Sequence, residues 1–156
     1  MPDRPLRPIG TPNLGNLLSD PALLLNERLL ERVRSAGFSD VRIAHTAVFR
    51  FVRDAGSRIT ELAQRAQLTK PTVVYLVNDL ERLGYVERVA DPDDGRAKLV
   101  RLTERGIAAR EAGRAAVVEI EGEWRAALGG ARFEQLRGLL LELRAFLWPP
   151  ESVDEL

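Results

Sequence analysis

The chain has 156 residues, of which 45% are hydrophobic and 29% charged, enough for one compact core but short for a two-domain enzyme. Its 23 basic and 23 acidic residues cancel, so bulk charge indicates no partner, and the absence of cysteine excludes disulfides and thiolate metal sites. The longest apolar runs, 21–25 and 138–141, are far below the roughly 20 residues of a membrane-spanning helix, and no signal-peptide stretch follows the N-terminus. We therefore expect a cytoplasmic protein with no membrane partner.

The first segment of the chain predicts a flexible arm followed by a helix. Residues 1–11 are rich in proline and carry Gly10. Capping residues precede prolines at 11–12 and 20–21, so we expect the first helix either to start twice or to kink near Ser19. Apolar residues at helical spacing continue this helix to the glycine at position 37.

Three helices are expected next, and the last two stand close together. The first covers about 41–55 and ends at Gly56. Thr60 is a predicted N-cap for a short helix over 61–66, and Thr69 caps a longer helix that ends at Gly84. This spacing is typical of a helix-turn-helix.

Alternating apolar and charged residues then predict two strands, over 85–89 and 97–102, separated by the sequence ADPDDG. Three aspartates in this stretch could suggest a calcium loop, but their spacing is wrong and no glutamate follows at the required distance. The composition favours a turn, and hence a β-hairpin directly after the helix pair. Arg88 and Arg101 are interpreted as strand-surface charges.

The C-terminal third predicts two helices. Thr103 caps a long helix that reaches about Leu128, where two glycines break it. The last helix, 131–147, carries a seam of leucines and is closed by Trp148 and two prolines. We expect another helix to cover this seam.

The helix pair and hairpin together suit DNA binding. The longer helix of the pair has a polar front, on which Lys70, Thr72, Tyr75 and Asn78 point away from an apolar rear, as a helix in the major groove requires. The free backbone N–H groups at the N-terminus of this helix can bind a DNA phosphate. For Tyr75, packing on its own helix is the alternative to a DNA contact.

The hairpin carries one arginine beside its acidic turn. Arg96 suits the minor groove, and Asp94 is expected to hold its guanidinium in place. Residues 57–105 hold nine basic and eight acidic residues, so affinity must come from the placement of charges and should fall steeply with salt.

From residue 59 to 106 the sequence ITELAQRAQLTKPTVVYLVNDLERLGYVERVADPDDGRAKLVRLTERG resembles the MarR family of winged helix-turn-helix transcriptional regulators. The resemblance implies a mainly α fold with a small β-hairpin wing, in which a winged helix-turn-helix domain is fused to an all-helical dimerisation platform. It also implies a homodimer that binds pseudo-palindromic double-stranded DNA. Two features depart from the family pattern: Gly95 stands where many members have a second wing arginine, and Pro21 interrupts the first helix.

The resemblance assigns residues and regions as follows. The DNA-binding residues are Thr69, Lys70, Pro71, Thr72, Tyr75 and Asn78 on the recognition helix and Asp94 and Arg96 on the wing. The regions are a flexible arm (1–11), N-terminal helices for scaffold and dimerisation (12–56), the winged helix-turn-helix (57–103), and the long and C-terminal helices for dimerisation (104–156).

The single histidine has two interpretations. His45 is either a hydrogen-bonded filler between helices or, with Arg42 and Phe49, part of an effector pocket of the type the family has. No nucleophile with a base, phosphate loop or cysteine is present, so we expect no enzyme activity, metal or cofactor. The predicted function is a transcriptional regulator, a repressor that responds to a small molecule. The alternative is a winged-helix protein-interaction (anti-repressor) module that does not bind DNA.

Overall fold

The computed structural model describes residues 11–147, so the predicted arm up to residue 10 and the closing segment from Trp148 lie outside the described residues. The described residues fall into two compact units, divided between Val117 and Val118 inside helix α5. No helix among them is long and apolar enough to cross a membrane.

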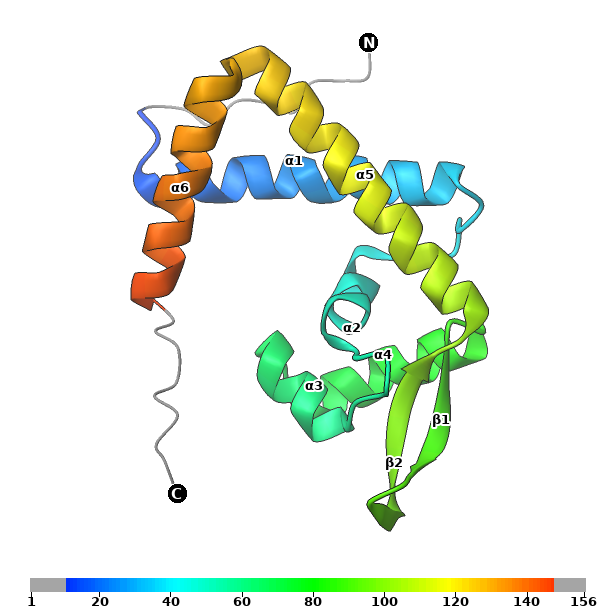
Figure 1. The fold of residues 1–156 in the computed structure, drawn as a ribbon. Coiled ribbons are helices and arrows are strands. Elements are labelled where there is room, and N and C mark those ends of the chain that lie inside the picture. Colours follow the sequence, from blue (N-terminus) through cyan, green and yellow to red (C-terminus); the bar gives the residue numbers. More distant parts are fainter. Residues whose placement is uncertain (1–10, 148–156) are drawn as a thin grey trace. The chain divides into compact units, whose positions relative to one another are not determined.

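Helix α1 (Leu14–Ser35) has one start and continues through Pro21 (Figure 1). Its N-cap is Asn13, whose side chain accepts a hydrogen bond from the backbone N–H of Asn16 at 3.0 Å. The predicted double start is therefore wrong. Pro21 has no N–H to offer the carbonyl of Leu17, and both residues are solvent-exposed, so that water can take the missing partner's place.

The predicted helix over 41–55 is much shorter than expected. A 3-10 turn, η1 (Ile43–His45), leads into helix α2 (Thr46–Phe51), and the chain turns extended at the buried residue Val52. The reason is tertiary: the backbone N–H and C=O of Ser57 both bond to Val100 at 2.9 Å, which draws this segment against the hairpin.

The helix-turn-helix is formed by α3 (Ile59–Ala66) and α4 (Lys70–Arg82). The predicted cap at Thr60 is wrong, because α3 begins two residues earlier than predicted and Arg58 occupies the N-cap position. The second cap is confirmed, since the Thr69 side chain accepts from the backbone N–H of Thr72 at 3.3 Å.

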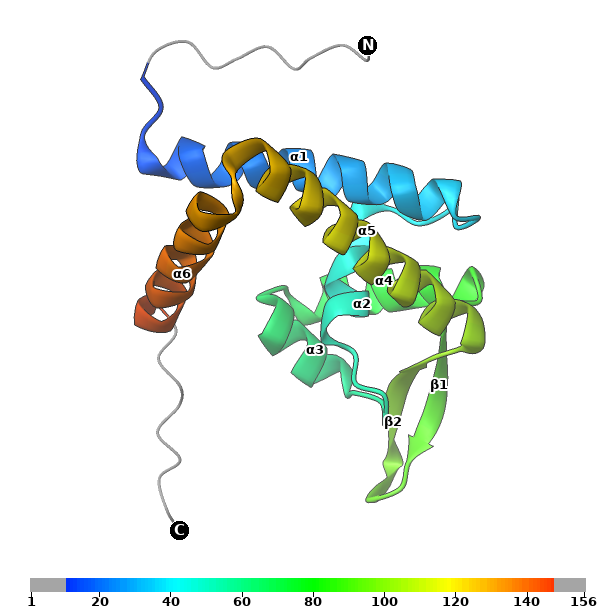
Figure 2. The same cartoon turned by 45° about the horizontal axis from the view of Figure 1, so that its top comes forward.

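The β-hairpin follows at once, with strands β1 (Val86–Asp91) and β2 (Asp94–Leu102) antiparallel. Both strands extend further toward the turn than predicted, so that only residues 92 and 93 lie outside them. Figure 2 shows, as Figure 1 does, that the hairpin projects beyond α3 and α4. The mainly helical fold with a hairpin wing is confirmed.

The core of the first unit joins α1, α2, the helix-turn-helix and the base of the hairpin. Tyr85 is completely buried at its centre, where its hydroxyl donates to the Asp40 carboxylate and its ring packs on Phe38 and Phe49. The other fully or nearly buried residues of this core include Val33, Val48, Leu62, Val73, Leu76, Val77, Leu80, Val86, Val100 and Leu102.

Helix α5 (Glu104–Leu128) begins as predicted, because the Thr103 hydroxyl accepts from the backbone N–H of Gly106 at 3.1 Å. Gly129 then takes a positive φ of 81° and α6 (Gly130–Leu147) follows. Within the second unit, the Arg125 guanidinium lies 4.9 Å from the ring centre of Phe133 and pairs with Glu134. The remaining apolar side chains of α6 are largely exposed, among them Leu136, Leu139, Leu140, Leu141, Phe146 and Leu147.

Candidate nucleic-acid interface

Helix α4 is amphipathic in the way a recognition helix must be. Its rear face, Val73, Leu76, Val77 and Leu80, is at most 4% exposed. The predicted contact residues Lys70, Pro71, Thr72, Tyr75 and Asn78 are all exposed on the other side. The structure therefore brings every predicted recognition-helix residue onto one polar surface.

The N-terminus of α4 presents backbone donors and one free cation. The hydroxyls of Thr69 and Thr72 lie 2.7 Å apart and share a hydrogen bond, which orders this first turn. The ammonium of Lys70 has no hydrogen bond or ion pair within residues 11–147. An exposed cation beside a helix N-terminus favours contact with a phosphate.

Tyr75 lies on the outer surface of α4. Its side chain is 61% exposed, and a hydrogen bond between its hydroxyl and Arg42, together with the Asp79 carboxylate, raises the pKa of that guanidinium. The exposed Tyr75 side chain lies on the outer side of α4, where it is accessible to DNA.

The arginine of the wing, Arg96, is exposed. Arg96 is exposed on β2, and its guanidinium has no partner in the described part of the chain. The expected pairing with Asp94 is not formed, because Asp94 Oδ1 instead accepts from the backbone N–H of Arg96 at 3.2 Å. Asp94 shapes the strand end, and the guanidinium stays available for a groove or phosphate.

Arg58, which the sequence did not single out, ties the wing to the start of α3. Its Nε donates to Asp91 Oδ2 at 2.7 Å, and its NH2 lies 3.7 Å from Asp94 Oδ2. Asp91 is only 5% exposed and also accepts from the backbone N–H of Asp93, which bends the turn. The turn aspartates therefore orient Arg58 rather than Arg96. The sequence pattern could not predict this pair, because Arg58 and Asp91 are 33 residues apart.

The comparisons with known proteins agree with this arrangement. Residues 39–97 match the model of the MarR family. Among solved structures, CouR from Rhodococcus jostii RHA1, bound to p-coumaroyl-CoA, is similar with a TM-score of 0.69 and 25% identity over 88% of this chain and 94% of its own.

Over residues 39–97 the chain is similar to the MarR family, and its fold is that of the family's winged-helix regulators.

Two further structures show the same fold. A MarR-family transcriptional regulator from Rhodococcus sp. RHA1 has a TM-score of 0.68 at 24% identity, covering 88% of this chain and 94% of that one. A MepR mutant from S. aureus bound to an oligodeoxyribonucleotide has a TM-score of 0.58 at 22% identity, covering 88% and 99%. No curated protein matches the sequence.

His45 is completely buried and forms hydrogen bonds between η1 and α4. Its Nδ1 accepts from the backbone N–H of Arg42 at 3.2 Å, so Nε2 carries the proton and donates to Asp79 Oδ2 at 2.9 Å. Burial lowers the pKa of His45, which keeps the ring neutral at pH 7. These bonds agree with the interpretation of His45 as a filler between helices.

Asp79 is the centre of that cluster. It accepts from Arg82 at 2.7 Å, from His45 and from Arg42. These donors, Arg82 foremost, lower its pKa from 3.8 to about 2. A carboxylate held by three donors fixes α4 to the segment before α2, and so positions the recognition helix.

The three predicted effector residues are not gathered at one cavity. Arg42 and His45 meet at Asp79, whereas Phe49 packs edge-to-face on Tyr85 with ring centres 5.7 Å apart. Their role in effector binding stays a prediction.

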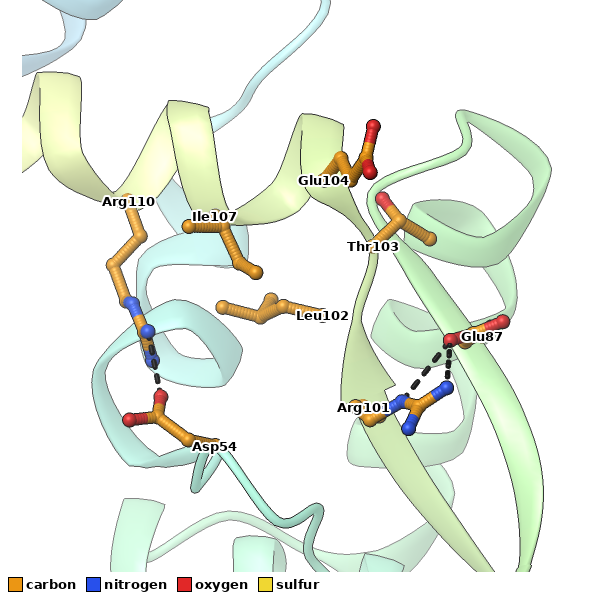
Figure 3. Close-up of a pocket in the computed structure, with 8 residues that line it drawn as sticks. All are labelled: Asp54, Glu87, Arg101, Leu102, Thr103, Glu104, Ile107 and Arg110. Atoms are coloured by element: carbon orange, nitrogen blue, oxygen red, sulfur yellow. Dashed lines mark hydrogen bonds and ion pairs between the residues drawn. The ribbon is translucent and has the colours of Figure 1, made fainter.

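A hollow of about 490 Å³ lies elsewhere, between the hairpin base and the start of α5 (Figure 3). Figure 3 shows Leu102 and Ile107 between two ion pairs, Arg110 with Asp54 and Arg101 with Glu87. Each arginine of the hollow already has its carboxylate, so its walls offer no unpaired positive charge.

Proposed function

We propose that this chain is a homodimeric, sequence-specific DNA-binding repressor that responds to a small-molecule effector. The observation that carries the proposal is the polar outer face of α4, flanked by two cations without partners among the described residues, Lys70 and Arg96. In this assignment Thr72, Tyr75 and Asn78 face the base edges of a major groove. Lys70 contacts a phosphate, and Arg96 enters the adjacent minor groove.

The exposed apolar side chains support a homodimer. On α1, Leu14, Leu17 and Leu23 are each more than half exposed. On α6, Leu139 and Phe146 are 57% and 81% exposed. Apolar surfaces of this extent on helices are typical of an interface with another chain. A dimer related by two-fold symmetry would place two recognition helices about one DNA turn apart, which matches a pseudo-palindromic site.

The effector is supported by the relative CouR, whose structure contains p-coumaroyl-CoA. For this chain we place effector binding near Arg42, His45 and Phe49, because Arg42 and His45 contact α4 through Asp79. A ligand that displaced Arg42 from Asp79 would release one of the bonds that position the recognition helix. Such a ligand would lower DNA affinity only to the extent that it prefers the displaced arrangement.

The proposal is tested by selecting bound fragments from a random duplex library with the purified protein and then titrating the winner at several salt concentrations. We expect an enriched pseudo-palindrome and an affinity that falls steeply with salt. Failure to bind any duplex at low ionic strength would favour the anti-repressor module instead. Screening small molecules for release of the selected duplex then tests the effector.

A further inference from the structure

Arg88, on strand β1, binds two side chains of α4 that lie one helical turn apart. Its NH2 group donates to Asn78 Oδ1 at 2.6 Å, and its NH1 group pairs with the Glu81 carboxylate. The Arg88 side chain is only 25% exposed. It is therefore a bridge between the wing and the recognition helix, in addition to being a charge on the strand surface.

This bridge determines the orientation of the Asn78 amide, that is, whether its oxygen or its nitrogen faces Arg88. A guanidinium has only N–H donors and the amide nitrogen also only donates, so the atom that faces Arg88 must be the amide oxygen. The reversed amide would oppose donor to donor and lose a charge-assisted hydrogen bond. The Nδ2 group of Asn78 consequently points away from Arg88, with both of its hydrogens available.

Glu81 gives the guanidinium a second partner in this position. Its carboxylate holds the second nitrogen of Arg88 from the same face of α4. Arg101, the other arginine on the hairpin's strands near its base, pairs with Glu87 across the strands and makes no hydrogen bond or ion pair with an α4 side chain in the described structure. The hairpin therefore supplies one guanidinium to the recognition helix and one to itself.

We propose that Arg88 is a positioning residue that sets the base preference of Asn78. By holding the amide with its N–H donors outward, it makes Asn78 select a base that presents an acceptor in the major groove, such as guanine O6 or N7, adenine N7 or thymine O4. It makes Asn78 reject cytosine, whose N4 amino group is a donor. This inference rests on the proposed function, because it requires α4 to lie in a major groove.

The test compares base preference across variants. Asn78→Ala, applied to the selected duplex, identifies the base pair that Asn78 reads. Four duplexes that differ only at that pair are then titrated by fluorescence anisotropy at fixed salt. We expect the wild-type protein to prefer an acceptor base over cytosine by about tenfold. We expect Arg88→Ala to bring that ratio close to one, because the freed amide can turn over and accept from cytosine.

A double variant and a conservative variant separate positioning from other roles. In the Asn78→Ala protein, which has lost its preference at this base pair, adding Arg88→Ala should not change the ratio of affinities for the four duplexes further. Arg88→Lys should keep part of the wild-type ratio, because an ammonium also only donates. Arg88→Gln keeps the length of the side chain but can donate or accept, so it should flatten the ratio even where Arg88→Ala does not fold. Arg101→Ala is the matched control and should keep the full ratio.

Four experimental outcomes would contradict either the role of Arg88 or the proposed function. A wild-type ratio retained by folded Arg88→Ala or Arg88→Gln overturns the proposal. An equal loss on all four duplexes, with a salt slope reduced by about one, also overturns it and shows instead that Arg88 contacts a phosphate. If Asn78→Ala changes preference at no position, Asn78 is no reader and the proposal is overturned. Only the absence of any duplex binding by the wild-type protein counts against the proposed function itself.

Discussion

Replacing Asp79 with asparagine is expected to destabilise the protein in a pH-dependent manner. Asparagine keeps an oxygen to accept from His45 but loses the charge that attracts Arg42 and Arg82. The fall of the Asp79 pKa from 3.8 to about 2 corresponds to about 2 kcal/mol. Because Arg42 and Arg82 are 48% and 70% exposed, solvent screening reduces the expected loss for Asp79→Asn to about 1–2 kcal/mol.

The sign of the pH dependence follows from linkage. The native pKa of Asp79 lies below its value in the unfolded chain, so its stabilisation is fully present above about pH 5 and is lost as the pH falls toward 2. Urea unfolding of both proteins at one fixed protein concentration, from pH 7 down to pH 3, measures this difference. The difference in the free energy of unfolding between wild type and Asp79→Asn should become smaller as the pH approaches 3.

The control is Asp54→Asn. Asp54 also has a lowered pKa, caused first by its hydrogen bond from Arg110, but its side chain is 87% exposed. We expect little loss of stability from this change. A constant gap for Asp79→Asn at every pH, or an equal effect of Asp54→Asn, would show that the Asp79 cluster does not act through charge.

Further changes test the interface, the dimer and the fold. Arg96→Ala should weaken binding to the selected duplex by about tenfold with an unchanged Tm, because the guanidinium contacts nothing else described; unchanged affinity would remove the wing assignment. Lys70→Ala should weaken all duplexes alike and lower the salt slope by about one, which titration at several salt concentrations measures. Leu140→Asp should shift the protein toward monomers in analytical ultracentrifugation, and an unchanged mass would place the dimer contact elsewhere. Gly106→Ala should destabilise by more than about 2 kcal/mol, because its Cβ would lie 2.0 Å from the Tyr85 carbonyl oxygen. Gly113→Ala, with only ordinary contacts at 3.9 Å, should raise Tm by virtue of better helix propensity.

The winged helix-turn-helix was predictable because its signals are local. Thr69 and Thr103 cap their helices as expected, since a capping hydroxyl needs only a backbone N–H three residues away. The rear face of α4 and the hairpin follow from periodicities of three to four and of two. The exposure of the recognition-helix residues follows from the same periodicity, because burying Val73 and Leu80 turns the opposite side of the helix outward.

Elements whose ends depend on distant partners were not predictable. Helix α2 ends early because Ser57 pairs with Val100, and a periodic apolar pattern cannot report a partner 43 residues away. The side-chain pairs that hold the candidate site together also join residues distant in the sequence, so the sequence pattern could not predict them.

The amino-acid sequence by itself determined which residues line the recognition helix and the wing, because amphipathic spacing and turn chemistry act within a few residues. Only the tertiary structure decided how those residues are held. It placed Arg58 on Asp91, His45 and Arg42 on Asp79, and Arg88 on Asn78. These are ion pairs and hydrogen bonds between elements, and they form only after the hydrophobic core has brought the helices and the hairpin together.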